Sequence, residues 1–313
     1  MRRRKLGKTG LDVSEISFGA WQLGNADDWE AMDDATAHSL VAAALDHGIN
    51  LFDTAPNYAA TNSERILGEA LVGKRDQVVL VSKFGHRPEG PKDFSVGWFH
   101  ESLAASLKRL RTDFLDVLLL HNPPEPVYQG TDPIWEELEK AKASGMIRHY
   151  GASLDFVDEI EACLNNTGSE VLEIFFNILH QDVRRAFPLV RERRPGVIVK
   201  IPLDSGWLTG RLDASSAFTG IRARWSPEQV ARRAELVGRL DWLAAGGVPL
   251  ARKALAFVLS YDEVSCVIPG MRDRDQLRMN LEAAGDSLTD GEKMRLENFW
   301  VDFTDNGSDL LPW

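Results

Sequence analysis

The stretch Asn50-Leu-Phe-Asp-Thr-Ala-Pro-Asn-Tyr58 places a carboxylate, Asp53, at the end of a short apolar run and a phenol, Tyr58, shortly after it. Both groups need polar partners, because removing either from water without one costs free energy. Two further apolar runs also end in a polar group: Val78-Val-Leu-Val-Ser-Lys83 ends in a lysine, and Asp116-Val-Leu-Leu-Leu-His121 ends in a histidine. This repeated pattern is typical of buried parallel strands whose ends carry the functional groups.

The composition narrows the function classes before any motif is considered. Hydrophobic residues make up 44% and charged residues 27% of the 313 positions, as in ordinary globular proteins. The formal net charge of −11 argues against a nucleic-acid or anionic-membrane surface, because such surfaces need basic patches. Cys163 and Cys266 are too few for a disulfide framework. Because the basic residues 2–5 precede no apolar segment, and no stretch approaches about 20 apolar residues, we expect a cytoplasmic protein without a membrane span.

Strand-like and helix-like patterns alternate along nearly the whole chain. Strands are expected at residues 16–18, 49–52, 78–81, 114–120, 147–150, 171–176, 197–201 and 264–268. Helices are expected at residues 35–47, 63–71, 96–110, 132–144, 155–164, 183–193, 250–259 and 274–284. Eight such units predict an α/β fold in which a parallel sheet closes into a (β/α)₈ TIM barrel. A doubly wound sheet is the alternative, but it would usually carry a G-x-G-x-x-G motif, and the chain has none.

Three segments lie outside this alternation. Residues 3–14 predict a β-hairpin, and residues 289–303 predict an extra C-terminal helix. Residues 203–235 form a long irregular loop after the seventh strand, followed by a helix to about Ala245. Ser63 is expected to be the N-cap of its helix. We expect all of these elements to belong to one domain that spans the whole chain.

The polar groups at the strand ends suggest acid–base chemistry. Each is weak evidence alone, because such residues are commonly helix caps, ion-pair partners or satisfied core groups. In a barrel, however, Asp53, Lys83 and His121 would meet at one mouth, with Tyr58 on the adjoining loop. An ammonium beside a phenol lowers the phenol pKa, and a carboxylate holds that ammonium in place. Tyr58 would then protonate a substrate oxygen, while His121 donates a hydrogen bond that orients it.

Such a site suits the addition of hydride to a carbonyl. Because no side chain donates hydride, a nicotinamide cofactor is required. Two later stretches are candidates for holding it: residues 202–211 after the seventh strand, and residues 269–272 after the eighth, just before a helix. Barrels commonly bind phosphate with these two loops and a helix N-terminus. Either stretch alone could equally be a simple turn.

With these residues in place, the chain resembles the aldo-keto reductases over nearly its whole length. Residues 6–14 are similar to the family's opening hairpin, which plugs the bottom of the barrel. Residues 52–58, with Ser63-Glu64 and Leu67-Gly68, are similar to its catalytic segment. The residues that match its cofactor loops are Pro202, Leu203, Ser205, Gly206, Leu208, Gly210, Gly270, Gln276 and Asn280.

The resemblance implies an NADPH-dependent carbonyl reductase, with NADH as the alternative cofactor. Its catalytic residues would be Asp53, Tyr58, Lys83 and His121. Ser153 falls where the family binds the nicotinamide carboxamide, and Gln276 and Asn280 would face the adenine end. We predict that Arg272 binds the 2′-phosphate.

The chain also departs from the family pattern around the nicotinamide. Leu154 stands in place of an asparagine, and Glu173 stands in place of a glutamine. Lys200 and Ile201 replace a Tyr-Ser pair, so the aromatic ring that usually stacks on the nicotinamide is missing. We expect Glu173 and Lys200 to remain cofactor contacts and to form an ion pair with each other.

The substrate pocket should be formed by the loops at the mouth. Its expected walls are Trp21, Phe84, Trp98, Trp207 and the tail around Trp313, together with Tyr58 and His121. Aromatic walls favour an apolar or sugar-like carbonyl compound.

Alternatives to a carbonyl reductase remain at this stage. A sugar or alcohol dehydrogenase that uses NAD(P) in the oxidative direction would share every residue named. A nucleotide-sensing binding subunit with slow turnover would keep the barrel and the cofactor. A metal-dependent barrel hydrolase would need a cluster of His and carboxylate ligands at the strand ends, and His121 is the only histidine among the proposed catalytic groups. The sequence leaves the oligomeric state open.

Overall fold

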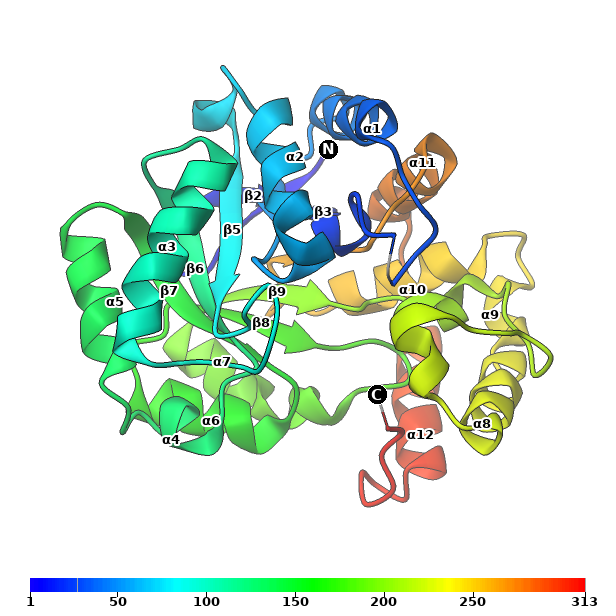
Figure 1. Cartoon of the computed structure of the whole chain (residues 1–313). Helices are drawn as coiled ribbons and strands as arrows, with labels where there is room; N and C mark the ends of the chain where they lie inside the picture. The colour runs from blue at the N-terminus through cyan, green and yellow to red at the C-terminus, as the bar shows by residue number, and fades with distance from the viewer. Residues whose placement is uncertain (27, 313) are drawn as a thin grey trace.

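Eight parallel strands form the centre of the molecule (Figure 1). The computed structural model describes residues 1–26 and 28–312. In spatial order the sheet runs β10-β9-β8-β7-β6-β5-β4-β3. The strands are β3 (Phe18–Gly19), β4 (Leu51–Asp53), β5 (Val79–Phe84), β6 (Leu115–His121), β7 (Ile147–Leu154), β8 (Val171–Phe175), β9 (Gly196–Lys200) and β10 (Cys266–Val267).

The two edges of this sheet meet. Parallel bridges join Ile16 to Val267 and Gly19 to Gly270, so the first strand lies beside the last. The predicted α/β TIM barrel is therefore confirmed, and the doubly wound alternative, which needs an open sheet, is wrong.

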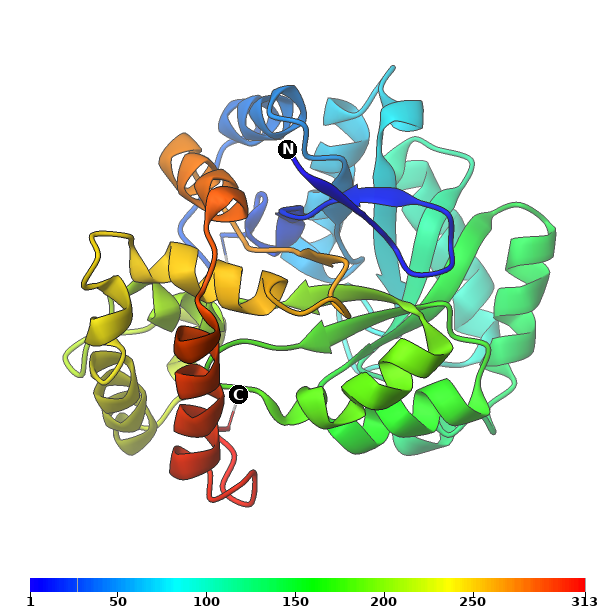
Figure 2. The same cartoon turned by 180° about the vertical axis from the view of Figure 1, so that it is seen from behind.

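Helices surround the strands on the outside of the barrel (Figures 1 and 2). They are α1 (Asp34–Asp46), α2 (Asn62–Ala70), α3 (Val96–Leu110), α4 (Glu125–Tyr128), α5 (Ile134–Ala143), α6 (Val157–Asn166), α7 (Phe187–Arg193), α8 (Pro227–Gly238), α9 (Asp241–Ala244), α10 (Leu250–Leu259), α11 (Arg274–Glu282) and α12 (Asp290–Phe303). The predicted C-terminal helix, α12, lies beside α8 in both views, and Arg232 of α8 donates a hydrogen bond to the Phe303 carbonyl. Among the described residues, no helix is both long and apolar enough to cross a membrane.

The N-terminal hairpin closes the bottom of the barrel. Its strands β1 (Arg3–Lys5) and β2 (Asp12–Ser14) pair antiparallel, as predicted. Leu6 and Val13 are fully buried and pack with the inward-facing residues of the strands. Gly7 has φ +54° and lies so close to the chain before β9 that an added Cβ would sit 2.2 Å from the Gly196 nitrogen. The hairpin therefore packs as a plug through a contact that leaves no room for a side chain.

Two local expectations are wrong. Helix α2 begins at Asn62 behind Thr61, which has φ +80°, so Ser63 is not the N-cap. The Ser63 hydroxyl instead donates to the Ala20 carbonyl at 2.8 Å. Helix α8 begins at Pro227, inside the segment expected to be irregular, because Ser226 forms a capping box at its start.

The rows of inward-facing side chains explain why charges gather at the mouth. Side chains on a strand alternate between the two faces, so every second residue points into the barrel. The lower inward positions are apolar: Leu51, Val79, Val81, Val117, Leu119, Val171 and Ile198. The next inward position on six consecutive strands is polar: Asp53, Lys83, His121, Ser153, Glu173 and Lys200. The barrel thus has a dry interior beneath a layer of buried polar groups, and this layer forms the floor of the candidate site.

Candidate active site

The predicted catalytic side chains converge around the Lys83 ammonium. Lys83 Nζ lies 2.5 Å from Asp53 Oδ1 and 3.4 Å from the Tyr58 hydroxyl. It also donates to the Thr54 carbonyl at 3.2 Å. The side chain of Lys83 is fully buried, and that of Asp53 is 2% exposed. The structure therefore brings an ammonium, a carboxylate and a phenol from two strands and a loop into direct contact.

A strained turn presents Tyr58 to the mouth. The 3₁₀ turn Tyr58–Thr61 contains Ala59 and Ala60 at φ 51° and 46°, a left-handed conformation that L residues rarely adopt. The Tyr58 ring stacks on Trp21 with ring centroids 6.0 Å apart. These constraints hold the phenol over the buried lysine.

His121 approaches Tyr58 from β6. The two rings meet edge to face, with centroids 6.0 Å apart. On its other side, His121 stacks on His86 at 4.2 Å. His121 Nδ1 is buried and has no hydrogen-bond partner among the described residues. The imidazole is thus fixed by ring contacts and keeps hydrogen-bonding capacity for a ligand.

Both imidazoles are held in the neutral form. Burial is the main cause that lowers the pKa of His121 well below its usual value, and the neighbouring His86 and Lys83 act in the same direction. Burial, followed by the charge of Lys92, lowers the pKa of His86 to about 4. His86 was not among the predicted site residues. It could have been found from its place three residues after Lys83, in the loop that follows β5.

The protonation of Tyr58 differs from the sequence-based expectation. Burial raises the pKa of the phenol, and the charge of Lys83 lowers it by a smaller amount. The expected net lowering is therefore wrong, because the sequence does not report how deeply the hydroxyl is buried. Burial alone would lower the pKa of Lys83, but the carboxylates of Asp53 and Glu173 outweigh it and raise that pKa. The catalytic tetrad, which consists of Asp53, Tyr58, Lys83 and His121, therefore holds a charged lysine beside a protonated phenol.

These groups open into a cavity of about 670 Å³. Tyr58 and His121 line it, together with Trp21 from the loop after β3. The predicted cofactor residues that line it are Glu173, Lys200, Pro202, Leu203, Ser205, Gly206, Gly270, Arg272, Gln276 and Asn280. The barrel mouth and the last two loops thus share one hollow.

Comparison with known proteins identifies this arrangement. The sequence model of the Aldo/keto reductase family matches residues 15–300. The chain belongs to this family. Its fold matches the holo form of the aldo-keto reductase AKR11C1 from Bacillus halodurans with a TM-score of 0.81, at 28% identity and covering 96% of each chain.

Two named relatives of this aldo/keto reductase indicate the range of activities nearby. The L-galactose dehydrogenase of Arabidopsis thaliana is 30% identical over 292 residues, which cover 90% of this chain and 87% of the relative. The NADH-specific methylglyoxal reductase of Escherichia coli is 28% identical over 317 residues, which cover 93% and 96%. Family membership implies NAD(P)H-dependent carbonyl reduction, and the names of these two relatives differ in substrate.

The end of the cavity beside α11, where we predicted the adenine contacts, has unsatisfied polar groups that fit a nucleotide. In the part of the chain that the structure describes, both amide atoms of Asn280 are buried without a hydrogen-bond partner. A buried amide of this kind is costly unless a ligand completes its hydrogen bonds. Gln276, one helical turn earlier in α11, accepts a hydrogen bond from the Arg272 backbone. Arg272 itself forms an ion pair with Glu30, with Nη2 and Oε2 2.6 Å apart.

Several predicted contacts lie away from the cavity wall. Ser153 lies beneath it, where its hydroxyl contacts Glu173 and Lys200. Leu208 is buried in the outer core, and Gly210 ends the turn after it with φ +71°. Neither belongs to the cavity wall, because the turn Asp204–Thr209 directs them toward the surrounding helices and surface.

Two aromatic residues expected in the substrate pocket are core residues. Phe84 follows the inward-facing Lys83, so it points outward and packs edge to face on Phe94 and Phe99. Trp207 is fully buried. It packs against the aromatic rings of Phe218 and Trp225 in the long loop. Of the expected aromatic walls other than the catalytic Tyr58, Trp21 lines the catalytic cavity and Trp98 does not. The Trp98 ring packs against the Arg87 guanidinium group, 4.3 Å from the ring centroid. Trp313 lies outside the described residues.

The expected ion pair between Glu173 and Lys200 is indirect. Lys200 Nζ lies 2.8 Å from the Ser153 hydroxyl, which lies 2.9 Å from Glu173 Oε1. The direct partner of Glu173 is Lys83, 3.2 Å from its Oε2, and the direct partner of Lys200 is Asp155 at 2.8 Å. Because the inward positions of distant strands converge in a small barrel, Glu173 of β8 reaches Lys83 of β5 across the interior.

Proposed function

We propose that this aldo/keto reductase reduces the carbonyl of a small polar substrate with NADPH, using Tyr58 as the general acid. One observation carries the proposal: the Lys83 ammonium lies between the Asp53 carboxylate and the Tyr58 hydroxyl, beneath the cavity. A bound reduced nicotinamide would supply the hydride. Tyr58 would donate its phenolic proton to the substrate oxygen as that oxygen gains charge. His121, being neutral, would donate a hydrogen bond to the same oxygen and hold it near the phenol.

The preference for NADPH rests on charges at the adenine end. Arg272 and Arg222 both line the cavity, and Glu30 pairs with Arg272. The Glu30 side chain is 86% exposed, so it can move aside without losing buried contacts. A 2′-phosphate, which carries more negative charge than one carboxylate, would then bind between the two guanidinium groups.

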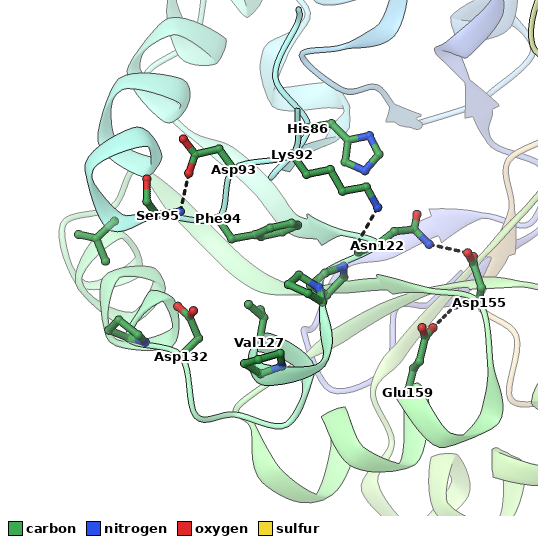
Figure 3. A pocket seen from close by; sticks show the side chains of 15 residues that line it. His86, Lys92, Asp93, Phe94, Ser95, Asn122, Val127, Asp132, Asp155 and Glu159 are labelled. Carbon is green, nitrogen blue, oxygen red and sulfur yellow. Dashed lines mark hydrogen bonds between the residues drawn. The ribbon is translucent and has the colours of Figure 1, made fainter. Parts of the chain in front are cut away.

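A second cavity supports a polar substrate. It has a volume of about 1000 Å³ and shares His86 and Asn122 with the catalytic cavity (Figure 3). Its polar walls are Lys92, Asp93, Ser95, Asp132, Asp155 and Glu159, and prolines form much of the rest. These donors and acceptors suit a substrate that carries several hydroxyl groups, so we favour a sugar-like carbonyl compound over an apolar one.

A dehydrogenase that works in the oxidative direction is the second candidate. The name of the L-galactose dehydrogenase relative favours it, and the same four side chains would serve, with Tyr58 as the base. It differs in requiring the phenolate form of Tyr58.

Nucleotide titration followed by a substrate panel tests the proposal. Binding of NADPH and NADH would be followed by the fluorescence of the nine tryptophans, of which Trp21 and Trp29 line the cavity. We expect saturable binding, tighter for NADPH, and oxidation of the bound nucleotide by short aldoses faster than by alkanals of equal length. Binding without turnover of any aldehyde, ketone or sugar would favour a nucleotide-sensing subunit instead. Turnover of alcohols alone would favour the dehydrogenase.

A further inference from the structure

Two buried charges beneath the cavity have no role in the proton transfer described above. Glu173 of β8 is 1% exposed, and its carboxylate forms an ion pair with Lys83 at 3.2 Å. Lys200 of β9 is 9% exposed, and its ammonium contacts the Ser153 hydroxyl and the Asp155 carboxylate, each at 2.8 Å. Charges at such depth are costly unless they are compensated, so their retention requires an explanation.

Ser153 links the negative charge of Glu173 to the positive charge of Lys200. The Ser153 hydroxyl donates to Glu173 Oε1 and accepts from Lys200 Nζ, so it links a carboxylate to an ammonium that does not touch it. Burial would raise the pKa of Glu173, but Lys83 and then Lys200 outweigh it and lower that pKa. Without Lys200, two carboxylates would face the single charge of Lys83.

Glu173 also changes what Lys83 can do for Tyr58. Lys83 is in contact with two carboxyl groups, Asp53 at 2.5 Å and Glu173 at 3.2 Å, while the Tyr58 hydroxyl is farther away at 3.4 Å. Burial, and then the charge of Glu173, raises the pKa of Asp53 well above its usual value, whereas the pKa of Glu173 is lowered, so Glu173 is the carboxyl group that carries the charge. A cation that an anion already neutralises stabilises a second anion less, so a phenolate at Tyr58 would gain little from Lys83.

We propose that Glu173 and Lys200, bridged by Ser153, form a compensated charge couple in which the Glu173 carboxylate pairs with Lys83 and so keeps Tyr58 in its phenol form. This inference rests on the proposed function, in which the phenol is the proton donor. It adds a pH dependence to that function: reduction uses the phenol over a wide pH range, whereas oxidation, which needs the phenolate as base, should become faster as the pH rises. Glu173 and Lys200 are positioning residues, since they act through Lys83.

The groups that face the couple come from all sides of the mouth. Around Glu173 they are Asp53, Tyr58, Lys83, Ser153 and Cys266, and around Lys200 they are His86, Lys92, His121, Asn122, Asp155 and Glu159. The imidazoles of His86 and His121 are neutral, as described above. Burial raises the pKa of the Cys266 thiol to about 12. The charges that remain to set the state of Tyr58 near neutral pH are therefore the carboxylates and the lysines.

Ultraviolet titration of tyrosinate in the nucleotide-free protein tests the couple directly. The chain has four tyrosines, so the spectrum of a Tyr58→Phe protein in the same background isolates Tyr58 by difference. In Glu173→Gln we expect Tyr58 to ionise at least about one pH unit below the wild type, because an anion beside Lys83 has been removed. In Lys200→Met it should ionise no earlier than in the wild type. In the double variant, which removes both charges, it should return toward the wild-type value.

The kinetic counterpart is the pH profile of kcat/KM for alcohol oxidation, which rises as Tyr58 ionises. If Tyr58 ionises one pH unit lower in Glu173→Gln, this profile should reach its plateau about one pH unit below that of the wild type. In Lys200→Arg, which keeps the charge, Tyr58 should ionise at the wild-type pH. The inference is overturned if Tyr58 ionises at the same pH in Glu173→Gln as in the wild type, or if the pH profile of alcohol oxidation keeps its wild-type position in this folded, near-isosteric variant. A shifted titration in a protein that reduces no carbonyl would leave the couple standing and reject the proposed function.

Discussion

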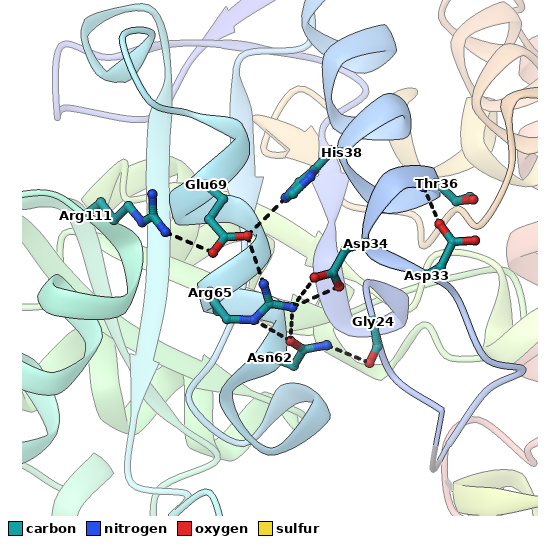
Figure 4. Close-up of polar contacts among 9 residues, drawn as sticks. All are labelled: Gly24, Asp33, Asp34, Thr36, His38, Asn62, Arg65, Glu69 and Arg111. Atoms are coloured by element: carbon teal, nitrogen blue, oxygen red, sulfur yellow. Dashed lines mark hydrogen bonds and ion pairs between the residues drawn. The ribbon is translucent and has the colours of Figure 1, made fainter.

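Two charge clusters in this barrel use the same side-chain chemistry in opposite environments. On the surface, Arg65 of α2 forms ion pairs with Asp34 of α1 and Glu69 at 2.8 Å, and Arg111 reaches Glu69 at 2.9 Å (Figure 4). At the mouth, Lys83 pairs with Asp53 and Glu173 at similar distances. The difference is exposure: 39% for the Arg65 side chain and none for Lys83.

Exposure decides what each cluster contributes. Exposed ion pairs gain little, because water and salt screen them and ordered side chains lose entropy. Buried ion pairs cost free energy to desolvate, and they change the protonation of every group nearby. The surface cluster therefore holds α1, α2 and the end of α3 together weakly, whereas the buried cluster sets the acid–base state of the site.

The largest difference should come from removing the central cation of each cluster. Lys83→Met leaves the Glu173 carboxylate buried without a direct cation, so the free energy of unfolding at neutral pH should fall by about 3–5 kcal/mol. Carbonyl reduction should be lost with it. Urea denaturation followed by circular dichroism measures the loss. A Lys83→Met protein as stable as the wild type would mean that Glu173 is not ionised in the folded state.

Lowering the pH should destabilise the folded protein through His86 and His121, the two imidazoles beside the buried cluster. His86 and His121 are neutral in the folded protein, so between about pH 6.5 and pH 4 the unfolded chain binds more protons. The two histidines should therefore make the free energy of unfolding rise with pH across this interval, by at most about 1.4 kcal/mol per pH unit each. Asp53 acts in the opposite direction, because burial raises its pKa well above the usual value and the folded protein then binds more protons at this group. His86→Gln should remove its share of this slope in urea titrations at several pH values. An unchanged slope would show that His86 titrates normally in the folded protein.

Substitutions of Arg272 and Glu30, the charged residues where we propose that the adenine end binds, should have effects of intermediate size. Arg272→Ala should weaken NADPH binding about tenfold or more, because a charge-assisted contact to the 2′-phosphate is lost, and should change NADH binding little. Glu30→Ala is the matched control, and it should tighten NADPH binding because the competing carboxylate is gone. Fluorescence titration with both nucleotides measures this. Equal losses for both nucleotides in Arg272→Ala would refute the assignment of Arg272.

The surface cluster should show the smallest effect. Arg65→Ala should lower the free energy of unfolding by no more than about 1 kcal/mol, and the loss should shrink in high salt. Carbonyl reduction should be unaffected, since Arg65 lies on the outer helices. A loss comparable to that of Lys83→Met would end the distinction between the two clusters.

The fold and the tetrad were accessible from the sequence for one physical reason. The alternation of side chains along a strand is a local pattern that can be read from the sequence. Asp53, Lys83 and His121 each follow apolar inward-facing residues at the end of such a strand. The same rule applied to Phe84 would have placed it outside the barrel, since it follows an inward lysine. Phe84 was expected in the pocket because it is aromatic and lies near the mouth, but strand alternation turns its ring toward Phe94 and Phe99.

Other features depend on distances that the sequence does not encode. Glu173 meets Lys83 across the barrel, from a strand three places away in the sheet. The sequence suggested Lys200 instead, because Glu173 and Lys200 both replace family residues around the nicotinamide. The raised pKa of Tyr58 depends on how deeply the hydroxyl is buried. His86 joined the site through a ring contact with His121, which only the fold reveals.

The most direct measurement is single-turnover carbonyl reduction by Tyr58→Phe with a saturating reduced nucleotide. Removing the phenolic hydroxyl should leave nucleotide binding intact and slow the disappearance of dihydronicotinamide absorbance by about 10²–10⁴-fold, since the proton donor is gone. Reduction at the wild-type rate by a folded, nucleotide-saturated Tyr58→Phe protein would contradict the claim that the phenol beside Lys83 delivers the proton.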